Sequence, residues 1–302
     1  MTTPKERIGF VGLGNMGRPM ASNLARKGFP LVVLDTVPER MEALSALGAR
    51  RAGDVSELIE ASDITVTMLP DTPDVERIVA GPGGLLERGR PGMLHLDTST
   101  ISPAASRAMA ERLAARGIRF VDAGVGRSPA HAERGESLFM VGAEPADMDR
   151  VRPLLEAMGD RIIHAGPPGT GIALKIVNNY IAMCLCQVNA EAFTLAAKLG
   201  LQARTLFDVV TSSLSSNDHL KLYWPTKALR GDTEPGFALD LAFKDLSIGV
   251  AAASAAGAPA HVGTAARDAM GRARAERGLG AHDVTAVLLA AAAEAGIEPP
   301  ML

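Results

Sequence analysis

Lys175, Asn178 and Asn179 stand together in the segment K-I-V-N-N, and their types and spacing could perform proton transfer. Positions four apart share one face of a helix, so Lys175 and Asn179 lie together with Asn178 beside them. A lysine gives a proton to a nascent alkoxide when burial and a neighbouring positive charge lower its pKa toward neutrality. An asparagine holds substrate oxygens without adding charge. The alternative is a solvated lysine on the helix surface.

The stretch GFVGLGNMGRPM places glycines in the pattern G-x-G-x-x-G, directly after a strand-like run and at the start of a helical one. Gly12 allows the tight turn, Gly14 lets the backbone approach a pyrophosphate, and Gly17 lets helix and strand pack closely. The helix N-terminus then offers N–H groups and a partial positive charge to the phosphates. We therefore predict a dinucleotide site that also includes Leu13, Asn15 and Met16.

Asp35 ends the second strand-like run, at the position where a carboxylate can bind the adenosine ribose 2′-OH and would repel a 2′-phosphate. This favours NAD as the cofactor, with NADH preferred over NADPH. Arg40 lies nearby in the sequence and leaves the preference between the two open.

Two further strand ends should face the cofactor, because ligands bind at the carboxyl ends of parallel strands. One carries Met68, Leu69 and Pro70, and the other is the run D-T-S-T that ends at Thr100. The hydroxyl of Thr100 could contact the nicotinamide or the substrate. The alternative is that both are ordinary turns, since Ser, Thr and Pro are common there.

A single guanidinium, Arg127, stands between Gly126 and Ser128 in a loop that leaves a strand at Asp122. An arginine there could hold the anionic tail of a substrate, because it offers a fork of donors and a permanent charge. The alternative is a solvent-facing residue paired with Glu133 or Glu136, and surface pairs of that kind contribute little.

The elements that must position these residues alternate along the first half of the chain. Strand-like runs are expected at 8–11, 31–34, 64–69, 93–97, 118–122, 138–141 and 161–164, with helices at 15–27, 38–47 and 103–116 between some of them. Apolar strands separated by helices indicate a parallel sheet covered on both faces. We predict an α/β fold in which residues 1–165 form a Rossmann-type, doubly wound, mostly parallel sheet that binds NAD.

The second half contains no strand alternation. One long helix is expected over about 171–199, and Gly200 ends it. The remainder is Ala-rich and helical, so residues 166–302 are predicted to form an all-α substrate and dimerisation domain joined to the first through that helix. A helix that is apolar on several faces needs several partners, which favours a homodimer or homotetramer.

Composition excludes several functional classes. The net charge of −3, from 31 basic and 34 acidic residues, gives no basic surplus for a nucleic acid. The apolar stretch 180–197 contains Gln187, Asn189 and Glu191, which argues against a membrane span, and the N-terminus leaves no room for a signal peptide. Cys184, Cys186 and six scattered histidines have no metal-ligand spacing. We expect a reduced, cytoplasmic, metal-free protein.

Several segments together resemble the β-hydroxyacid dehydrogenase family, to which 3-hydroxyisobutyrate dehydrogenases belong. GFVGLGNMGRPMASNL is similar to its nucleotide-binding opening, MLP and DTSTISP to its next cofactor segments, GTGIALKIVNN to its catalytic segment, and FKDL to its C-terminal lysine segment. The resemblance makes Lys175 the acid/base and Asn179 its partner. It places Lys244 near cofactor and substrate, and Leu69 and Thr100 on the cofactor.

The chain departs from the family at Gly126-Arg127-Ser128, where most members have Ser-Gly-Gly. The V-G-R-[ST] version is similar to the 3-sulfolactaldehyde reductase branch, which belongs to sulfoquinovose degradation. That resemblance implies reduction of 3-sulfolactaldehyde to 2,3-dihydroxypropane-1-sulfonate, with hydride from NADH and the proton from Lys175. It also implies that Asn178, Tyr180 and Ala182 line the substrate pocket.

Other hypotheses assign a different substrate or activity to the same residues. A small carboxylate could replace the sulfonate, with succinic semialdehyde, tartronate semialdehyde and 3-hydroxyisobutyrate as candidates. Imine reductases resemble this architecture, but we expect another proton donor in place of Lys175. In 6-phosphogluconate dehydrogenase a histidine usually stands where Asn178 does, and its chain is longer. A non-catalytic NAD-binding sensor is the alternative of another class, and intact Lys175 and Asn179 count against it.

Overall fold

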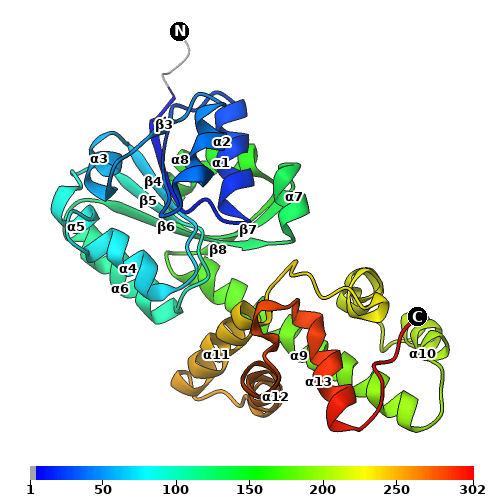
Figure 1. The fold of residues 1–302 in the computed structure, drawn as a ribbon. Helices are drawn as coiled ribbons and strands as arrows, with labels where there is room; N and C mark the ends of the chain where they lie inside the picture. The colour runs from blue at the N-terminus through cyan, green and yellow to red at the C-terminus, as the bar shows by residue number, and fades with distance from the viewer. Residues whose placement is uncertain (1–4) are drawn as a thin grey trace. The chain divides into compact units, whose positions relative to one another are not determined.

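A computed structural model describes residues 5–302, and residues 1–4 of the predicted N-terminal domain lie outside that description. The chain forms two compact units (Figure 1). The N-terminal unit ends at Lys175, and the C-terminal unit is Ile176–Leu302. We predicted the boundary at 165/166. The units instead divide inside the long helix, because its first turn packs on the backbone of the sheet.

The N-terminal unit is built on one eight-stranded sheet. Its strands are β1 Ile8–Val11, β2 Leu31–Leu34, β3 Arg50–Arg51, β4 Ile64–Thr67, β5 Leu94–Asp97, β6 Arg119–Gly126, β7 Ser137–Gly142 and β8 Gly159–Gly166. All seven expected strand runs form strands. β3 was not predicted, because its two residues are exposed arginines and carry no apolar signal.

The strand order is β3-β2-β1-β4-β5-β6-β7-β8. Every neighbouring pair is parallel except β6 and β7. The predicted doubly wound, mostly parallel sheet is therefore confirmed. After β1, strands β2 and β3 are added on one side of it, and β4 to β8 are then added on its other side. The strand order therefore reverses between β1 and β4, and sheets of this kind bind ligands at the carboxyl ends of the strands where the order reverses.

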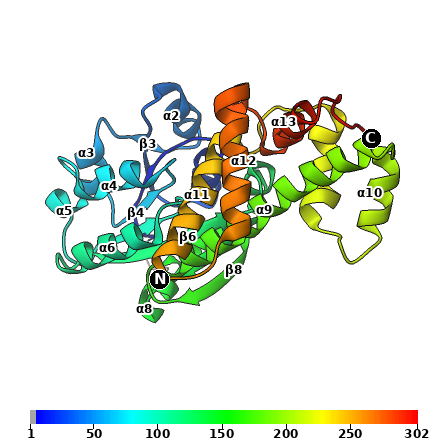
Figure 2. The ribbon, with the colours of Figure 1, turned by 90° about the horizontal axis from the view of Figure 1, so that it is seen from below.

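Helices cover both faces of this sheet (Figures 1 and 2). One face carries α1 Gly17–Arg26, α2 Pro38–Ser45, α7 Pro129–Glu133 and α8 Pro145–Met158. The other carries α3 Val55–Glu60, α4 Thr72–Ala80, α5 Leu85–Arg88 and α6 Pro103–Ala114. The main core lies under the first face, where apolar strand residues such as Phe10 and Val33 meet Met20 and Leu24 of α1. Burial on both faces explains why the central strands read as continuous apolar runs.

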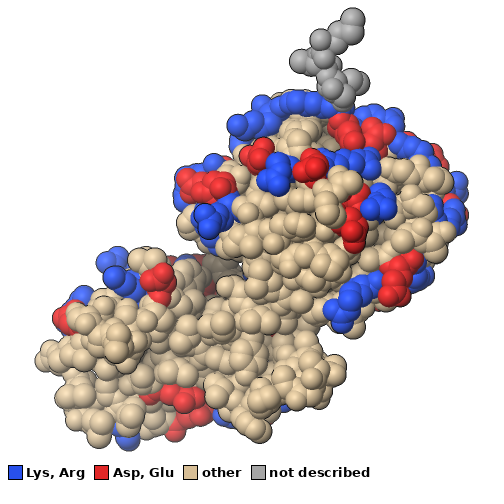
Figure 3. All heavy atoms as spheres, turned by 180° about the vertical axis from the view of Figure 1, so that it is seen from behind, with Lys and Arg blue, Asp and Glu red and all other residues tan. Residues whose placement is uncertain are grey.

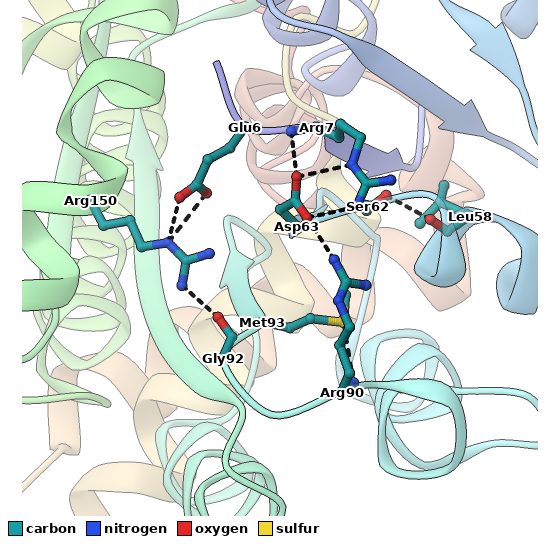
Figure 4. Close-up of polar contacts among 9 residues, drawn as sticks. All are labelled: Glu6, Arg7, Leu58, Ser62, Asp63, Arg90, Gly92, Met93 and Arg150. Carbon is teal, nitrogen blue, oxygen red and sulfur yellow. Dashed lines mark hydrogen bonds and ion pairs between the residues drawn. The ribbon is translucent and has the colours of Figure 1, made fainter. Parts of the chain in front are cut away.

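A charge network fastens the edge of the sheet opposite those carboxyl ends (Figure 4). Asp63, just before β4, accepts hydrogen bonds from Arg7 Nε at 3.0 Å and Arg90 Nη2 at 2.6 Å. Arg150 of α8 donates to Glu6 at 2.9 Å and to the carbonyl of Gly92 at 2.8 Å. The hydrogen bonds from Arg7 lower the pKa of Asp63 to about 2. The network therefore joins the starts of β1, β4 and β5.

The C-terminal unit is helical, as predicted. The long helix α9 runs Thr170–Lys198 and is followed by α10 Ala203–Thr211, α11 Leu239–Ala255, α12 His261–Arg277 and α13 Val287–Glu294, with short 3₁₀ and π turns between them. Its core includes Phe193 of α9, whose ring stacks on Trp224 at 6.0 Å between centroids. Cys184 and Cys186 are free, buried thiols of α9.

α9 is long and apolar enough to cross a membrane by length and composition alone, which is weak evidence for a single helix. Asn179, Gln187 and Asn189 on it are buried within the protein. On the face seen in Figure 3, lysines and arginines alternate with acidic side chains over the N-terminal unit, so charge of one sign does not accumulate there. Within residues 5–302, no group of three or more His, Cys, Asp or Glu side chains could hold a metal ion.

Candidate active site

The glycine loop between β1 and α1 has the geometry that a dinucleotide requires. Gly12 has φ +94°, and a Cβ there would meet the carbonyl of Met68, while a Cβ on Gly17 would overlap the carbonyl of Gly12. Over Gly14, in contrast, a Cβ would have no neighbour within 4 Å. The two outer glycines are thus required by packing, and the middle one leaves open space for a phosphate.

Asp35 is tied to this loop. Its Oδ2 accepts from the Leu13 N–H at 2.6 Å, and its Oδ1 accepts from the Val37 N–H at 2.8 Å. Arg40 approaches the same carboxylate at 3.4 Å. Each carboxylate oxygen has more than one acceptor position. The Asp35 side chain is only 4% exposed, and its contact with a ribose hydroxyl stays a prediction.

A buried hydrogen-bond network joins the ends of β4 and β5. Asp97 accepts from Thr67 Oγ1 at 2.8 Å and from the Ser99 N–H at 3.0 Å. The Ser99 hydroxyl accepts in turn from the Leu69 N–H at 2.9 Å. Burial raises the pKa of Asp97 to about 6, and its hydrogen bonds with Ser99 and Thr67 oppose that rise. The network fixes the two segments that carry Leu69 and Thr100.

β6 corrects our expectation for the segment around Arg127. The strand does not end at Asp122 but continues to Gly126, and Asp122 is buried inside it. Arg127 follows directly, with φ +72°, and it is the one non-glycine residue among 5–302 with positive φ. A side chain in the left-handed region costs free energy, so the surrounding structure must hold Arg127 in this conformation.

The partners of Arg127 also differ from those of the solvent-facing alternative. Its Nη1 donates to the main-chain carbonyl of Glu136 at 2.5 Å and to Asp160 Oδ1 of β8 at 2.7 Å. Neither the Glu133 nor the Glu136 carboxylate takes that role. Ser128 pairs its hydroxyl with His131 Nδ1 at 2.8 Å. Both contacts described for Arg127 use Nη1, and the Nε–Nη2 edge is one of the two edges through which a guanidinium binds an oxyanion in a bidentate manner.

The start of α9 places Lys175 against the same strand. Asp122 accepts from the Gly169 N–H at 2.5 Å and from the Ile172 N–H at 2.6 Å. Burial raises the pKa of Asp122 to about 6, and these backbone N–H groups oppose that rise. A Cβ on Gly124 would overlap Cβ of Lys175, so the lysine sits directly over the strand backbone at Gly124.

A second group of predicted residues meets within the C-terminal unit. Asn179 Nδ2 donates to Asp245 Oδ2 at 2.6 Å, and Lys244 Nζ lies 3.0 Å from Asp245 Oδ1. Asp245 is 3% exposed. This carboxylate therefore fixes the Asn179 amide, and contact of its second N–H with a substrate oxygen stays a prediction. We did not predict a role for Asp245, and its position beside Lys244 in FKDL was the available signal.

The remaining predicted pocket residues of α9 have different surroundings. Tyr180 packs against Gly249 and Gly263, and its hydroxyl accepts from the Gly263 N–H at 3.0 Å. Ala182 packs against the core of the C-terminal unit. Asn178 is exposed. Substrate contacts by these three residues stay a prediction.

Family models cover both units. The NAD binding domain of 6-phosphogluconate dehydrogenase matches residues 7–166, and the NAD-binding domain of NADP-dependent 3-hydroxyisobutyrate dehydrogenase matches residues 169–291. The chain belongs to the β-hydroxyacid dehydrogenase family. It is therefore an NAD-dependent oxidoreductase with a Rossmann-type domain, as predicted.

Individual relatives of this β-hydroxyacid dehydrogenase match over nearly their whole length. The 3-sulfolactaldehyde reductase of Escherichia coli K12 is 36% identical over 96% of this chain and 97% of its own. The 3-hydroxyisobutyrate dehydrogenase of Pseudomonas aeruginosa is 37% identical over 86% and 90%, respectively. The solved Mycobacterium tuberculosis 3-hydroxyisobutyrate dehydrogenase with L-serine has a TM-score of 0.87 and 34% identity, covering 95% of this chain and 99% of its own. These relatives act on small hydroxyacids or aldehydes, and their names include both sulfonate and carboxylate substrates.

Proposed function

We propose that this enzyme reduces a short anionic aldehyde to its alcohol with NADH, and that its substrate is 3-sulfolactaldehyde. The observation that carries the proposal is the turn Gly126-Arg127-Ser128 at the carboxyl end of β6, the same strand on which Lys175 rests at Gly124. The turn offers a permanent cation where a substrate tail would lie, and the lysine offers a proton where its carbonyl oxygen would lie.

The residues of this chain divide the reaction between them. The glycine loop and Asp35 hold the dinucleotide, which supplies hydride to the aldehyde carbon when it is bound. Lys175 gives a proton to the aldehyde oxygen, so that the aldehyde, one hydride and one proton become the alcohol. Asn179, which Asp245 fixes within the C-terminal unit, and Lys244 keep the roles that the family resemblance implies, as the partner of Lys175 and as a residue near cofactor and substrate.

Arg127 is the residue that selects an anion. A sulfonate has three acceptor oxygens and stays ionised at any cellular pH, and the Nε–Nη2 edge of a guanidinium suits such a group. Asp160 and Glu136 occupy only Nη1. The Asp160 side chain is 51% exposed, and exposed pairs contribute little, so the Asp160 pair does not prevent substrate binding.

The choice between sulfonate and carboxylate needs a substrate comparison. We expect kcat/KM for 3-sulfolactaldehyde to exceed that for succinic semialdehyde and tartronate semialdehyde, each measured with NADH and NADPH in parallel. 3-Hydroxyisobutyrate is already an alcohol, so its oxidation is measured with NAD+ and NADP+ and compared with the oxidation of 2,3-dihydroxypropane-1-sulfonate. Arg127→Ala should raise KM sharply for the sulfonate. A clear carboxylate preference would reject the substrate while keeping the family reaction.

Three further proposed properties rest on features described above. The Asp35 carboxylate supports NADH over NADPH, because it would repel a 2′-phosphate. Large apolar residues of α9 remain exposed in the monomer, among them Val177, Ile181, Val188 and Leu195. These residues support a homodimer or homotetramer, which light scattering would test. The free thiols of Cys184 and Cys186 support a reduced, cytoplasmic location.

A further inference from the structure

Asp122 holds the first turn of α9 onto β6. Its carboxylate, 1% exposed, accepts the N–H groups of Gly169 and Ile172. The N–H groups of a first helical turn have no carbonyl partner within the helix, and a negative charge is favourable there. The position at which α9 begins is therefore set by a side chain of the neighbouring strand.

Glycines let the helix backbone rest directly on the sheet at this point. Side chains two apart on a strand share a face, so Gly124 lies on the same face of β6 as Asp122. A Cβ on Gly124 would overlap Lys175, and a Cβ on Gly142 of β7 would overlap Asp122 and the Gly171 N–H. Any side chain at these glycines would displace the turn of α9 that carries Lys175.

We infer that Asp122 is a positioning residue that seats Lys175 over Gly124, so that β6 sets the separation between the proton donor and the anion-binding turn. Gly124 and Arg127 are three residues apart, so the backbone under Lys175 and the backbone of the turn are separated by at most about 10 Å. Asp122, Gly124, Arg127 and Lys175 all belong to the N-terminal unit. A fixed, short separation selects substrates by the number of carbons between aldehyde and anion. This inference rests on the proposed roles of Lys175 and Arg127.

The experiment compares two aldehydes that differ only in chain length. Succinic semialdehyde has two carbons between its carbonyl and carboxylate carbons, as 3-sulfolactaldehyde has between its carbonyl carbon and sulfur, and glutaric semialdehyde has three. We expect the wild type to prefer the shorter one. Asp122→Asn should lower kcat/KM for it roughly 10- to 100-fold, because a displacement of about 1 Å has that effect. The same variant should bring the ratio of kcat/KM for succinic semialdehyde to kcat/KM for glutaric semialdehyde toward one. Its Kd for NADH should stay unchanged.

Asp283 provides a matched control. It is a fully buried carboxylate in the C-terminal unit that also accepts backbone N–H groups, from Gly236 at 3.0 Å and Phe237 at 3.2 Å. Asp283→Asn should lower the melting temperature and leave the substrate ratio unchanged. Gly124→Ala is the second variant, because it displaces Lys175 while the Asp122 carboxylate remains. Its ratio of kcat/KM for the two aldehydes should also move toward one.

The outcomes separate the inference from the proposed function. The inference is overturned if the wild type shows no length preference, or if folded Asp122→Asn and Gly124→Ala proteins lose activity equally on both aldehydes. If Lys175→Ala keeps its turnover, or Arg127→Ala keeps its KM for anionic aldehydes, the proposed function itself fails. A lower melting temperature with an unchanged ratio would assign Asp122 a role in stability alone.

Discussion

Comparing Arg127→Ala with Arg127→Gly distinguishes the cost of the residue's backbone conformation from the contribution of its side chain to substrate binding. The residue has φ +72°, and a non-glycine residue in the left-handed region costs about 1–2 kcal/mol. Arg127→Ala keeps that strain and loses the pair with Asp160, which contributes roughly 0.2–1 kcal/mol at this exposure. Arg127→Gly loses the same pair but relieves the strain, offset by about 0.4–1 kcal/mol of added freedom in the unfolded chain.

We therefore expect the glycine variant to be more stable than the alanine variant by about 0.5–1 kcal/mol. In a chain of this size that difference corresponds to roughly 2 °C in melting temperature. Both variants should lose the charged hydrogen bonds to the substrate anion, about 1.5–3 kcal/mol, and raise KM roughly 10- to 100-fold with little change in kcat. Thermal unfolding and steady-state kinetics on the same two proteins measure both effects.

Arg134 is the matched control, because it also pairs with an acidic side chain, Glu136, at 2.7 Å but has φ −85°. There the order should reverse, with Arg134→Gly less stable than Arg134→Ala. The strain argument is refuted if Arg127→Ala is as stable as Arg127→Gly. The clamp is refuted if the two Arg127 variants keep the wild-type KM for 3-sulfolactaldehyde and succinic semialdehyde alike.

Three further outcomes test other parts of the molecule. Lys175→Ala should lower kcat by roughly 10²–10⁴-fold while fluorescence titration shows NADH still binding, and a kcat near wild type would remove the lysine from the proton transfer. Asp35→Asn keeps an acceptor for Leu13 but loses the charge, so the ratio of kcat/KM for NADPH over NADH should rise; a constant ratio would contradict the repulsion argument. The pKa of Asp63 is lowered from 3.8 to about 2, so its stabilisation is present above pH 4 and is lost as the pH falls toward 2. Between pH 4 and pH 2 the free energy of unfolding of Asp63→Asn should therefore fall by about 1 kcal/mol less than that of the wild type, after allowance for partial exposure. Parallel curves of this free energy against pH for wild type and variant would contradict the prediction.

Local sequence determined the features that depend on neighbouring residues. The expected packing at Gly12 and Gly17 is observed, because the tight turn and the close helix–strand contact leave no space for a side chain, while the role of Gly14 beside a phosphate stays a prediction. The long helix was predicted over 171–199 and runs over Thr170–Lys198, because its apolar run and the glycine after it are local signals. The parallel sheet followed from apolar strands that alternate with helices.

Tertiary structure decided the partners that come from distant parts of the chain. Asp122 lies in the strand-like run expected at 118–122 and also in the observed strand β6. Only the packing of α9 on β6, however, makes it the acceptor for the N–H groups of Gly169 and Ile172. Asp160 reaches Arg127 because β7 and β8 pair beside β6, and Asp245 reaches Asn179 across two helices. A sequence pattern gives residue types and spacing along one element. It does not specify which polar groups lose water together when separate elements pack, and that is what selects the partner of a buried carboxylate or amide.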